Sequence, residues 1–188
     1  MTSSNTLILT SELPPSVNHY LKYKIVRRGN RVFPSSYQSP ESIKYKRKFK
    51  KYVKEQIKIQ GWKVPEKDKL VYIYIEFYMD RKRKDPNNFF KVPLDALSEA
   101  GVYLDDDIAL PVTTRLYIDS KNPRMEMKLV ESEAIGVFND REHLNEFTIN
   151  NCINCRRDMN TCGIRKKLLE NRIVEEVNND NCMKKKPK

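Results

Sequence analysis

The sequence predicts an α/β protein, with a small mixed sheet and flanking helices followed by a small cysteine-rich appendage. Segments with apolar residues at every second position alternate with segments of helical apolar spacing, which indicates strands separated by helices. Hydrophobic residues make up 39% of the 188 positions, which is enough for one modest core and excludes a wholly disordered chain. All four cysteines follow residue 151, which indicates a separate terminal segment.

Composition and charge indicate a polyanionic partner. Lysine and arginine number 36 against 25 aspartate and glutamate, a net charge of +11, and so basic a small domain favours nucleic acid. The alternative is a basic surface that only keeps the protein soluble. No stretch approaches the ~20 apolar residues of a membrane span, and residues 1–10 lack the features of a secretory signal. We expect a cytoplasmic protein without a membrane partner.

The first part of the chain predicts a strand and a hairpin. Residues 7–9 form a short apolar run that ends before Pro14-Pro15, as a strand leading into a turn does. Residues 21–26 and 31–33 flank Gly29-Asn30, a pair that permits positive φ. These two segments therefore predict a hairpin.

A long basic helix is predicted to begin at Ser39 and to end at Gly61. Ser39 supplies a capping hydroxyl, and Pro40 needs no N–H partner in the first turn. Apolar residues recur at helical spacing, namely Tyr45, Phe49, Tyr52, Val53 and Ile57. Basic residues fill much of the rest, namely Lys44, Lys46, Arg47, Lys48, Lys50 and Lys51. This basic face lies along a phosphate backbone or is simply solvated, and the pattern leaves both open.

Residues 69–79 form the clearest predicted strand, because their apolar residues alternate and share one face. Tyr72, Tyr74 and Tyr78 share the other face. Aromatic rings on a sheet stack on bases or lie beneath a covering helix, and we favour the helix.

The next elements are predicted to be a helix and a second hairpin. The helix lies near residues 90–100, where Pro93 implies a late start or a kink. Residues 115–119 and 124–130 are predicted to pair with each other around a turn at Asn122-Pro123.

Acidic residues follow the predicted core strand and recur after the next helix. Asp85 belongs to the first set, and Asp105, Asp106 and Asp107 form the second. If the next strand lies beside the first, both sets converge at one edge of the sheet, where like charges need a cation between them. Mg²⁺ selects carboxylate oxygens and activates water. The alternative is that Asp85 and Asn87 cap a helix and that the later acids form an exposed loop.

Basic residues accompany the first acidic set. Arg81, Lys82, Arg83 and Lys84 add positive potential that suits a phosphodiester. A rival nuclease element is the acid-x-Lys triplet Glu126-Met127-Lys128, but such triplets arise by chance in a chain with 32% charged residues.

Two parts of the sequence resemble the RusA family of Holliday-junction resolvases. The first is Leu13-Pro14-Pro15-Ser16-Val17-Asn18-His19-Tyr20. The second, in order, is Arg83-Lys84-Asp85-Pro86-Asn87-Asn88, Lys91, Leu94-Asp95-Ala96-Leu97, Gly101-Val102 and Asp105-Asp106. The resemblance covers most of residues 5–131. It implies a bacterial or phage-encoded α/β homodimer that binds four-way DNA junctions and resolves them by paired symmetrical nicks, with Mg²⁺ or Mn²⁺, during recombination and repair.

The resemblance also implies roles for individual residues. The family's first acid matches Asp85, its lysine matches Lys91, and its late acid matches Asp106 with Asp105 beside it. Asp85, Asp105 and Asp106 are then the metal ligands, with Asn87 as a neutral ligand, and Lys91 contacts the scissile phosphate or stabilises the transition state. The implied DNA-binding residues are Arg81, Lys82, Arg83, Lys84 and Lys91. Asp95 matches a recurrent helix acid that we interpret as structural.

One position departs from the family motif. The family's second acid falls on Asn87, whose amide oxygen can bind a metal but brings no charge and cannot act as a base. Asp80, five residues before Asp85, is a poor substitute. Three hypotheses follow: an active metal-dependent endodeoxyribonuclease, a junction-binding protein weakened or inactivated by Asn87, and a zinc-containing regulator that uses the α/β domain as a scaffold.

The cysteines predict a zinc site. Cys152 and Cys155 have the two-residue spacing of a zinc knuckle, and Cys162 and Cys182 complete a Cys₄ set. Disulfides are disfavoured in a reducing cytosol, and unrelated free thiols are the alternative. His143 ranks second to Cys182 as fourth ligand, and His19 is expected to form a local hydrogen bond.

The predicted boundaries follow from these motifs. Residues 1–132 form the RusA-like nuclease domain and residues 133–150, which are polar and lack periodicity, form a linker. Residues 151–183 form the zinc-binding helical segment, and residues 184–188 form a basic tail.

Overall fold

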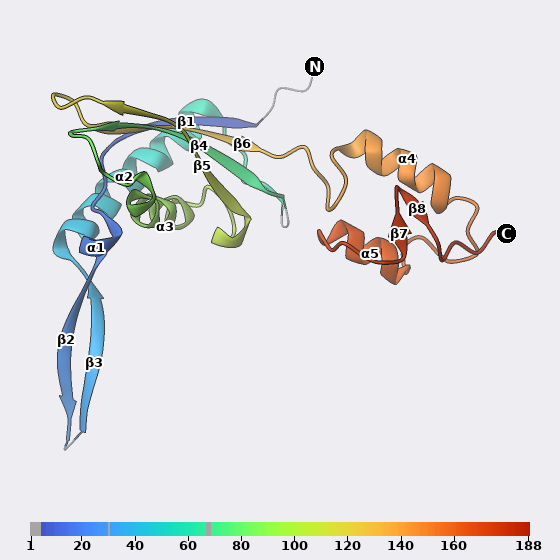
Figure 1. The fold of residues 1–188 in the computed structure, drawn as a ribbon, viewed down its shortest axis with the longest axis horizontal. Helices are drawn as coiled ribbons and strands as arrows, with labels where there is room; N and C mark the ends of the chain where they lie inside the picture. Colours follow the sequence, from blue (N-terminus) through green and yellow to red (C-terminus); the bar gives the residue numbers. More distant parts are fainter. Residues whose placement is uncertain (1–4, 30, 67–68) are drawn as a thin grey trace. The chain divides into compact units, whose positions relative to one another are not determined.

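The computed structural model describes residues 5–29, 31–66 and 69–188, and the chain divides into two compact units, Met1–Glu131 and Ser132–Lys188. Figure 1 shows the ribbon. The elements of the first unit, in chain order, are β1 (Thr6–Glu12), α1 (Val17–Tyr20), β2 (Leu21–Arg28), β3 (Arg31–Gln38), α2 (Pro40–Gln60), β4 (Val71–Met79), η1 (Pro86–Phe89), α3 (Lys91–Ala100), η2 (Asp106–Ile108), β5 (Ala109–Ile118) and β6 (Arg124–Glu131).

A four-stranded mixed sheet, in the order β1-β6-β4-β5, forms the centre of the first unit. The apolar residues of β4 are at most 1% exposed, as their alternation predicts, namely Val71, Ile73, Ile75, Phe77 and Met79. Helices α2 and α3 contribute Phe49, Val53 and Leu97 to the same core. The α/β class, with a small mixed sheet and flanking helices, is therefore confirmed (Figure 1).

The predicted hairpin between residues 115–119 and 124–130 is wrong. Strands β5 and β6 lie on either side of β4, which pairs parallel with β5 and antiparallel with β6. This arrangement gives the backbone of the buried strand β4 hydrogen-bond partners along both sides, which a β5–β6 hairpin would not. Helix α3 lies in the crossover that two parallel strands require.

The expectation that a helix covers the tyrosine face of β4 is also wrong among the described residues of this unit. Tyr74 is 38% exposed. The ring of Tyr78 stacks on Tyr117, with centroids 4.8 Å apart, and the Arg124 guanidinium lies 3.6 Å from its centroid. The apolar sides of α2 and α3 pack into the core on the opposite face, so side chains of the sheet itself shield this one.

Helix α2 has the predicted ends. The Ser39 side chain accepts a hydrogen bond from the Ser42 N–H at 3.2 Å, and Gly61 follows the helix with φ of 68°. Its basic face is partly neutralised within the unit, because Glu99 pairs with the buried Lys46 and with Lys50. Helix α3 begins at Lys91, so Pro93 lies in its first turn, where no N–H partner is needed.

The predicted first hairpin is confirmed as β2 and β3, which extend away from the sheet (Figure 1). Gly29 has the positive φ, 59°, that the turn requires, while Asn30 lies outside the described residues. Tyr23 and Ile25 are 76% and 75% exposed. An isolated two-stranded hairpin of this kind is only marginally stable in water.

The second unit includes the segment 133–150, and the prediction that this segment is a linker is wrong. Phe138, Leu144 and Phe147 are buried there in a second core with Leu168. The polar composition masked these few apolar residues, of which Leu144 and Phe147 lie on one side of the helix Arg141–Asn151 and Phe138 precedes that helix. The elements of this unit are α4 (Arg141–Asn151), α5 (Gly163–Leu169), β7 (Val177–Asn178) and β8 (Asn181–Cys182). None of the helices described in either unit could span a membrane.

Candidate active site

The loop after β4 folds back against its own strand through aromatic contacts. Phe89 and Phe90 pack on Phe77 of β4, and their ring centroids lie 6.3 and 5.9 Å from the ring centroid of Phe77. The loop is therefore held at one end by the sheet and at the other by a buried aromatic cluster. The polar side chains between these two points are presented at the surface.

Asp85 begins η1 in this loop. Its Oδ1 accepts a hydrogen bond from the Asn87 N–H at 2.9 Å, so the capping role considered from the sequence is present. The carboxylate is nevertheless exposed, and one hydrogen bond leaves most of its lone pairs free. Capping therefore orients Asp85 without preventing it from binding a cation.

Asp80 is engaged with Lys84 and is a poor replacement for the missing acid at Asn87. The Lys84 Nζ lies 2.6 Å from Asp80 Oδ1, and this bond lowers the pKa of the Asp80 carboxyl below its usual value. Between them, Arg83 has a left-handed φ of 63°, which is uncommon for a residue with a side chain.

The N-terminal motif and the acidic loop line one open groove, although they lie far apart in the sequence. One wall consists of Pro14, Pro15, Ser16, Asn18, His19 and Glu41. The other consists of Arg81, Arg83, Lys84, Asp85, Asn88 and Phe89. Of the implied DNA-binding residues, Lys82 and Lys91 do not line this groove.

The N-terminal wall is a part of the site that residue chemistry did not reveal. The sequence showed residues 13–20 only as a family motif, with a local role for His19. The His19 Nδ1 lies 3.5 Å from the Ser16 hydroxyl, which is a local hydrogen bond of the expected kind. The available signal was the rigid Pro14-Pro15 pair next to polar residues, but nothing in it specifies the opposite wall.

Lys91 is held by a network at the start of α3. Its Nζ lies 2.9 Å from Asp95 Oδ1, and the buried Tyr20 hydroxyl donates to Asp95 Oδ2. The Asp95 bond, with a smaller contribution from Asp106, raises the pKa of Lys91, so its ammonium is charged at neutral pH. Burial, with the Asp95 bond second, raises the pKa of Tyr20, so its hydroxyl remains a donor.

The second acidic set approaches the site by a route other than the one expected. Because β4 and β5 are parallel, the segment after β4 and the segment before β5 lie at opposite ends of the strand pair, and convergence at one sheet edge is wrong. Helix α3 contacts both η1 and η2. The Asp106 carboxylate is close enough to raise the pKa of Lys91 in α3. Asp105 caps η2, accepting the Asp106 N–H at 2.8 Å.

These acids form no ion pair within the described part of the chain. No lysine or arginine in the described ranges forms an ion pair with Asp85, Asp105, Asp106 or Asp107, all of which are exposed. Carboxylate and amide oxygens are the ligands that Mg²⁺ and Mn²⁺ prefer, so the donor set fits a hard divalent cation. Among residues 5–29, 31–66 and 69–188, however, no three His, Cys, Asp or Glu side chains form a group that could hold a metal ion.

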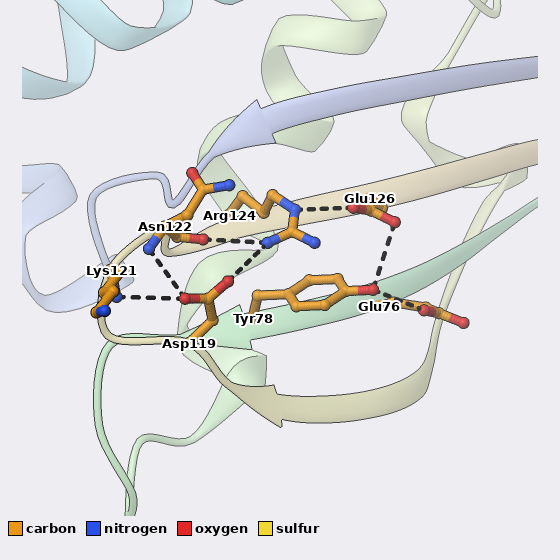
Figure 2. A network of polar contacts seen from close by, with 7 residues as sticks. All are labelled: Glu76, Tyr78, Asp119, Lys121, Asn122, Arg124 and Glu126. Atoms are coloured by element: carbon orange, nitrogen blue, oxygen red, sulfur yellow. Dashed lines mark hydrogen bonds and ion pairs between the residues drawn. The ribbon is translucent and has the colours of Figure 1, made fainter.

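The rival element at Glu126 belongs to a different, compensated network, shown in Figure 2. Arg124 Nε donates to Glu126 at 2.8 Å, and its NH1 donates to Asp119 at 3.0 Å. Tyr78 lies beneath the guanidinium. Since Glu126 already has a cationic partner, it is a poor candidate for a metal ligand.

The cysteines lie together in the second unit. Cys152, Cys155, Cys162 and Cys182 are free and line one cavity. They do not form a metal-holding group among the described residues, so the predicted zinc knuckle is not shown. His143 is bonded elsewhere, with Nε2 3.2 Å from Asp180, and does not line that cavity.

An open groove with exposed carboxylates beside guanidinium and ammonium groups, on a basic α/β domain, is the arrangement of an enzyme that cleaves phosphodiesters. Comparison with known proteins agrees. Residues 13–130 match the family Endodeoxyribonuclease RusA. The chain belongs to this family of endodeoxyribonucleases.

Individual relatives support the same assignment. A crossover junction endodeoxyribonuclease RusA from Escherichia coli is 30% identical over 128 residues, which cover 68% of this chain and 96% of the relative. Proteins of that name from Shigella sonnei and Enterobacteria phage 82 are each 31% identical over 135 residues, with the same coverage. The similarity thus accounts for nearly the whole of each relative.

Proposed function

We propose that this chain resolves four-way DNA junctions by paired, symmetrical nicks that depend on Mg²⁺ or Mn²⁺, in recombination and repair in the bacterial cytoplasm. The observation that carries the proposal is the groove, in which the N-terminal motif and the Asp85 loop face the same space. The names of the relatives supply the substrate, because they act on crossover junctions.

The proposed metal ligands are Asp85, Asp105 and Asp106, with Asn87 as a neutral ligand. When bound, the cation supplies an activated water and offsets charge on the phosphate in the transition state. Asp85 is already oriented by its cap, and Asp105 by its bond to the Asp106 N–H. These bonds orient Asp85 and Asp105 locally, and bringing the three acids around one cation requires them to move, because they form no metal-holding group among the described residues.

Lys91 is proposed to contact the scissile phosphate. Its ammonium is exposed, and Asp95 and Tyr20 fix its direction, so it offers a localised positive charge close to Asp106. Tyr20 and Asp95 are positioning residues in this scheme. Arg81, Arg83 and Lys84 line the groove and, with Lys82, are proposed to bind the DNA backbone.

We propose a homodimer because paired nicks need two sites and each chain carries one such groove. The β2–β3 hairpin is the candidate dimer surface, since its exposed Tyr23, Ile25 and Val32 leave an unusually apolar ribbon in water. Light scattering on the full chain measures the mass, and Tyr23→Lys with Ile25→Lys is expected to give monomers. A monomeric wild-type chain would contradict this part of the proposal.

A second candidate is a junction-binding protein whose cleavage is weak or lost. It is favoured by Asn87, which removes one anionic ligand, and by the absence of a three-acid group in the part of the chain that the structure describes. A synthetic four-way junction separates the two candidates. Nicking with Mg²⁺ or Mn²⁺ supports the nuclease, whereas tight binding in chelator without nicking in either metal supports the binding protein.

A further inference from the structure

The four cysteines of the chain surround one cavity in the second unit. Cys152 and Cys155 follow α4, Cys162 precedes α5, and Cys182 ends β8. All four are free and partly buried. Three separate segments thus bring every thiol of the protein to one place, which unrelated cysteines have no reason to do.

The backbone around these thiols is tightly bonded. The Cys155 N–H donates to the Cys152 carbonyl at 3.1 Å, which closes the turn between them. The Lys186 N–H donates to the Cys155 sulfur at 3.4 Å. An N–H group aimed at a sulfur atom stabilises the thiolate, which is the form that binds a metal.

Asn151 links the segment of Cys182 to the segment of Cys152. It is 5% exposed, and its side chain accepts the Cys182 N–H at 2.9 Å and donates to the Asp180 carbonyl at 2.8 Å. This buried amide therefore holds β8 against the end of α4. Metal ligands in proteins are generally positioned by hydrogen bonds of surrounding groups, and Asn151 supplies such a bond to the backbone of Cys182.

The second unit has little else to stabilise it. Strands β7 and β8 have two residues each, and α5 has seven. The buried apolar residues of its core are Phe138, Leu144, Phe147, Leu168 and Val174. A unit with so small a core usually depends on a cross-link or a bound metal.

We propose that Cys152, Cys155, Cys162 and Cys182 bind one zinc ion that stabilises the second unit. The cavity also carries Arg157, Arg165 and Lys184, whose charges offset the net negative charge of a zinc ion with four thiolates. The sulfur atoms surround the cavity without yet adopting a metal-holding arrangement, so binding draws the side chains inward and releases their thiol protons.

The test uses the full chain, expressed with zinc and purified under reducing conditions. Elemental analysis is expected to find about one zinc ion per chain. Titration of the zinc-free chain with Co²⁺ is expected to produce thiolate-to-cobalt charge transfer and the visible bands of a tetrahedral site. Cys182→Ser should weaken both signals, whereas the neighbouring Met183→Ser should retain them.

Several outcomes would overturn the proposal. One is a folded, reduced chain that contains no zinc and gives no thiolate–cobalt band. Another is a purified chain whose four cysteines form disulfides by mass spectrometry. If Cys182→Ser does not fold, Cys182→His and the cobalt spectrum of the wild type still test the zinc site, because histidine can replace one thiolate ligand. None of these measurements depends on DNA cleavage.

Discussion

Two groups of acidic side chains in the first unit differ in how their charge is compensated. In the network of Figure 2, Asp119 accepts hydrogen bonds from two backbone N–H groups and from Arg124, which also binds Glu126. In the proposed metal site, Asp85 and Asp105 each accept a local backbone N–H, and no described lysine or arginine pairs with either. The first group completes its interactions within the protein, while the second leaves exposed charge for a ligand.

The comparison distinguishes acids that stabilise the fold from acids available for chemistry. The Arg124 side chain is 22% exposed and contacts Tyr78, Asp119 and Glu126, so it is a structural part of the sheet. The proposed metal ligands Asp85, Asp105 and Asp106 are exposed at the starts of the short helices η1 and η2, where a cation can approach. Substitutions in the two groups should therefore affect different measurements.

The largest expected effect is on cleavage by Asp85→Asn. Loss of this anion should lower the rate of junction nicking on the order of 10²-fold or more. Binding of the junction in the presence of chelator should be retained, because the substitution removes no contact to the DNA backbone. Asp107→Asn, the same charge change at an exposed acid outside the proposed ligand set, is the control. Full activity in Asp85→Asn would remove Asp85 from the site.

Asn87→Asp should act in the opposite direction. The added carboxylate restores an anionic ligand, so the Mg²⁺ concentration needed for half-maximal nicking should fall on the order of tenfold. Asn160→Asp makes the same charge change in the second unit and should have no such effect. An unchanged metal dependence in Asn87→Asp would show that this position does not contact the cation.

Lys91→Met should lower the maximal nicking rate about tenfold or more, with a smaller change in junction affinity, because the ammonium is proposed to act on the phosphate in the transition state. Tyr20→Phe should show a weaker form of the same effect, since it removes only the hydroxyl bonded to Asp95. Single-turnover rates at saturating enzyme separate the maximal nicking rate from the affinity for the junction. An effect on affinity alone would make Lys91 a DNA-binding residue.

The smallest effect on cleavage is expected for Arg124→Gln, which should instead lower the melting temperature. The hydrogen bond from the Asn122 N–H, and to a smaller extent the one from the Arg124 side chain, lowers the pKa of Asp119 below its ordinary value of 3.8. When the pKa of a carboxyl is lower in the folded protein than in the unfolded chain, its ionisation stabilises the fold at pH values above the unfolded-chain pKa. This stabilisation is lost as the pH falls through the pKa of the folded protein. The difference in melting temperature between wild type and Arg124→Gln should therefore shrink below about pH 4.

The parts of the fold that were predictable are those encoded locally. The alternating apolar residues of β4, the cap at Ser39 and the turn at Gly61 each specify their own conformation. The order of the strands was not predictable in this way, because periodicity shows which face of a strand is buried but not which strand lies next to it. This is why β5 and β6 were paired with each other and not with β4.

The candidate site was predictable only in part for the same reason. Acid type and spacing indicated Asp85 and the second acidic set, and the family motif indicated Lys91. The groove wall around Pro14 and His19, and the Tyr20–Asp95 bond that orients Lys91, depend on contacts between distant segments. No local pattern encodes such contacts, so they required the folded chain.

Occupancy of the groove by a divalent ion is best measured with Mn²⁺, whose free form is quantified by electron paramagnetic resonance. The full-length wild type should bind Mn²⁺ at its groove, and Asp85→Asn and Asp106→Asn should each weaken that binding, while Arg124→Gln should leave it unchanged. Equal Mn²⁺ binding in wild type, Asp85→Asn and Asp106→Asn would contradict the proposal that these two acids share one ion.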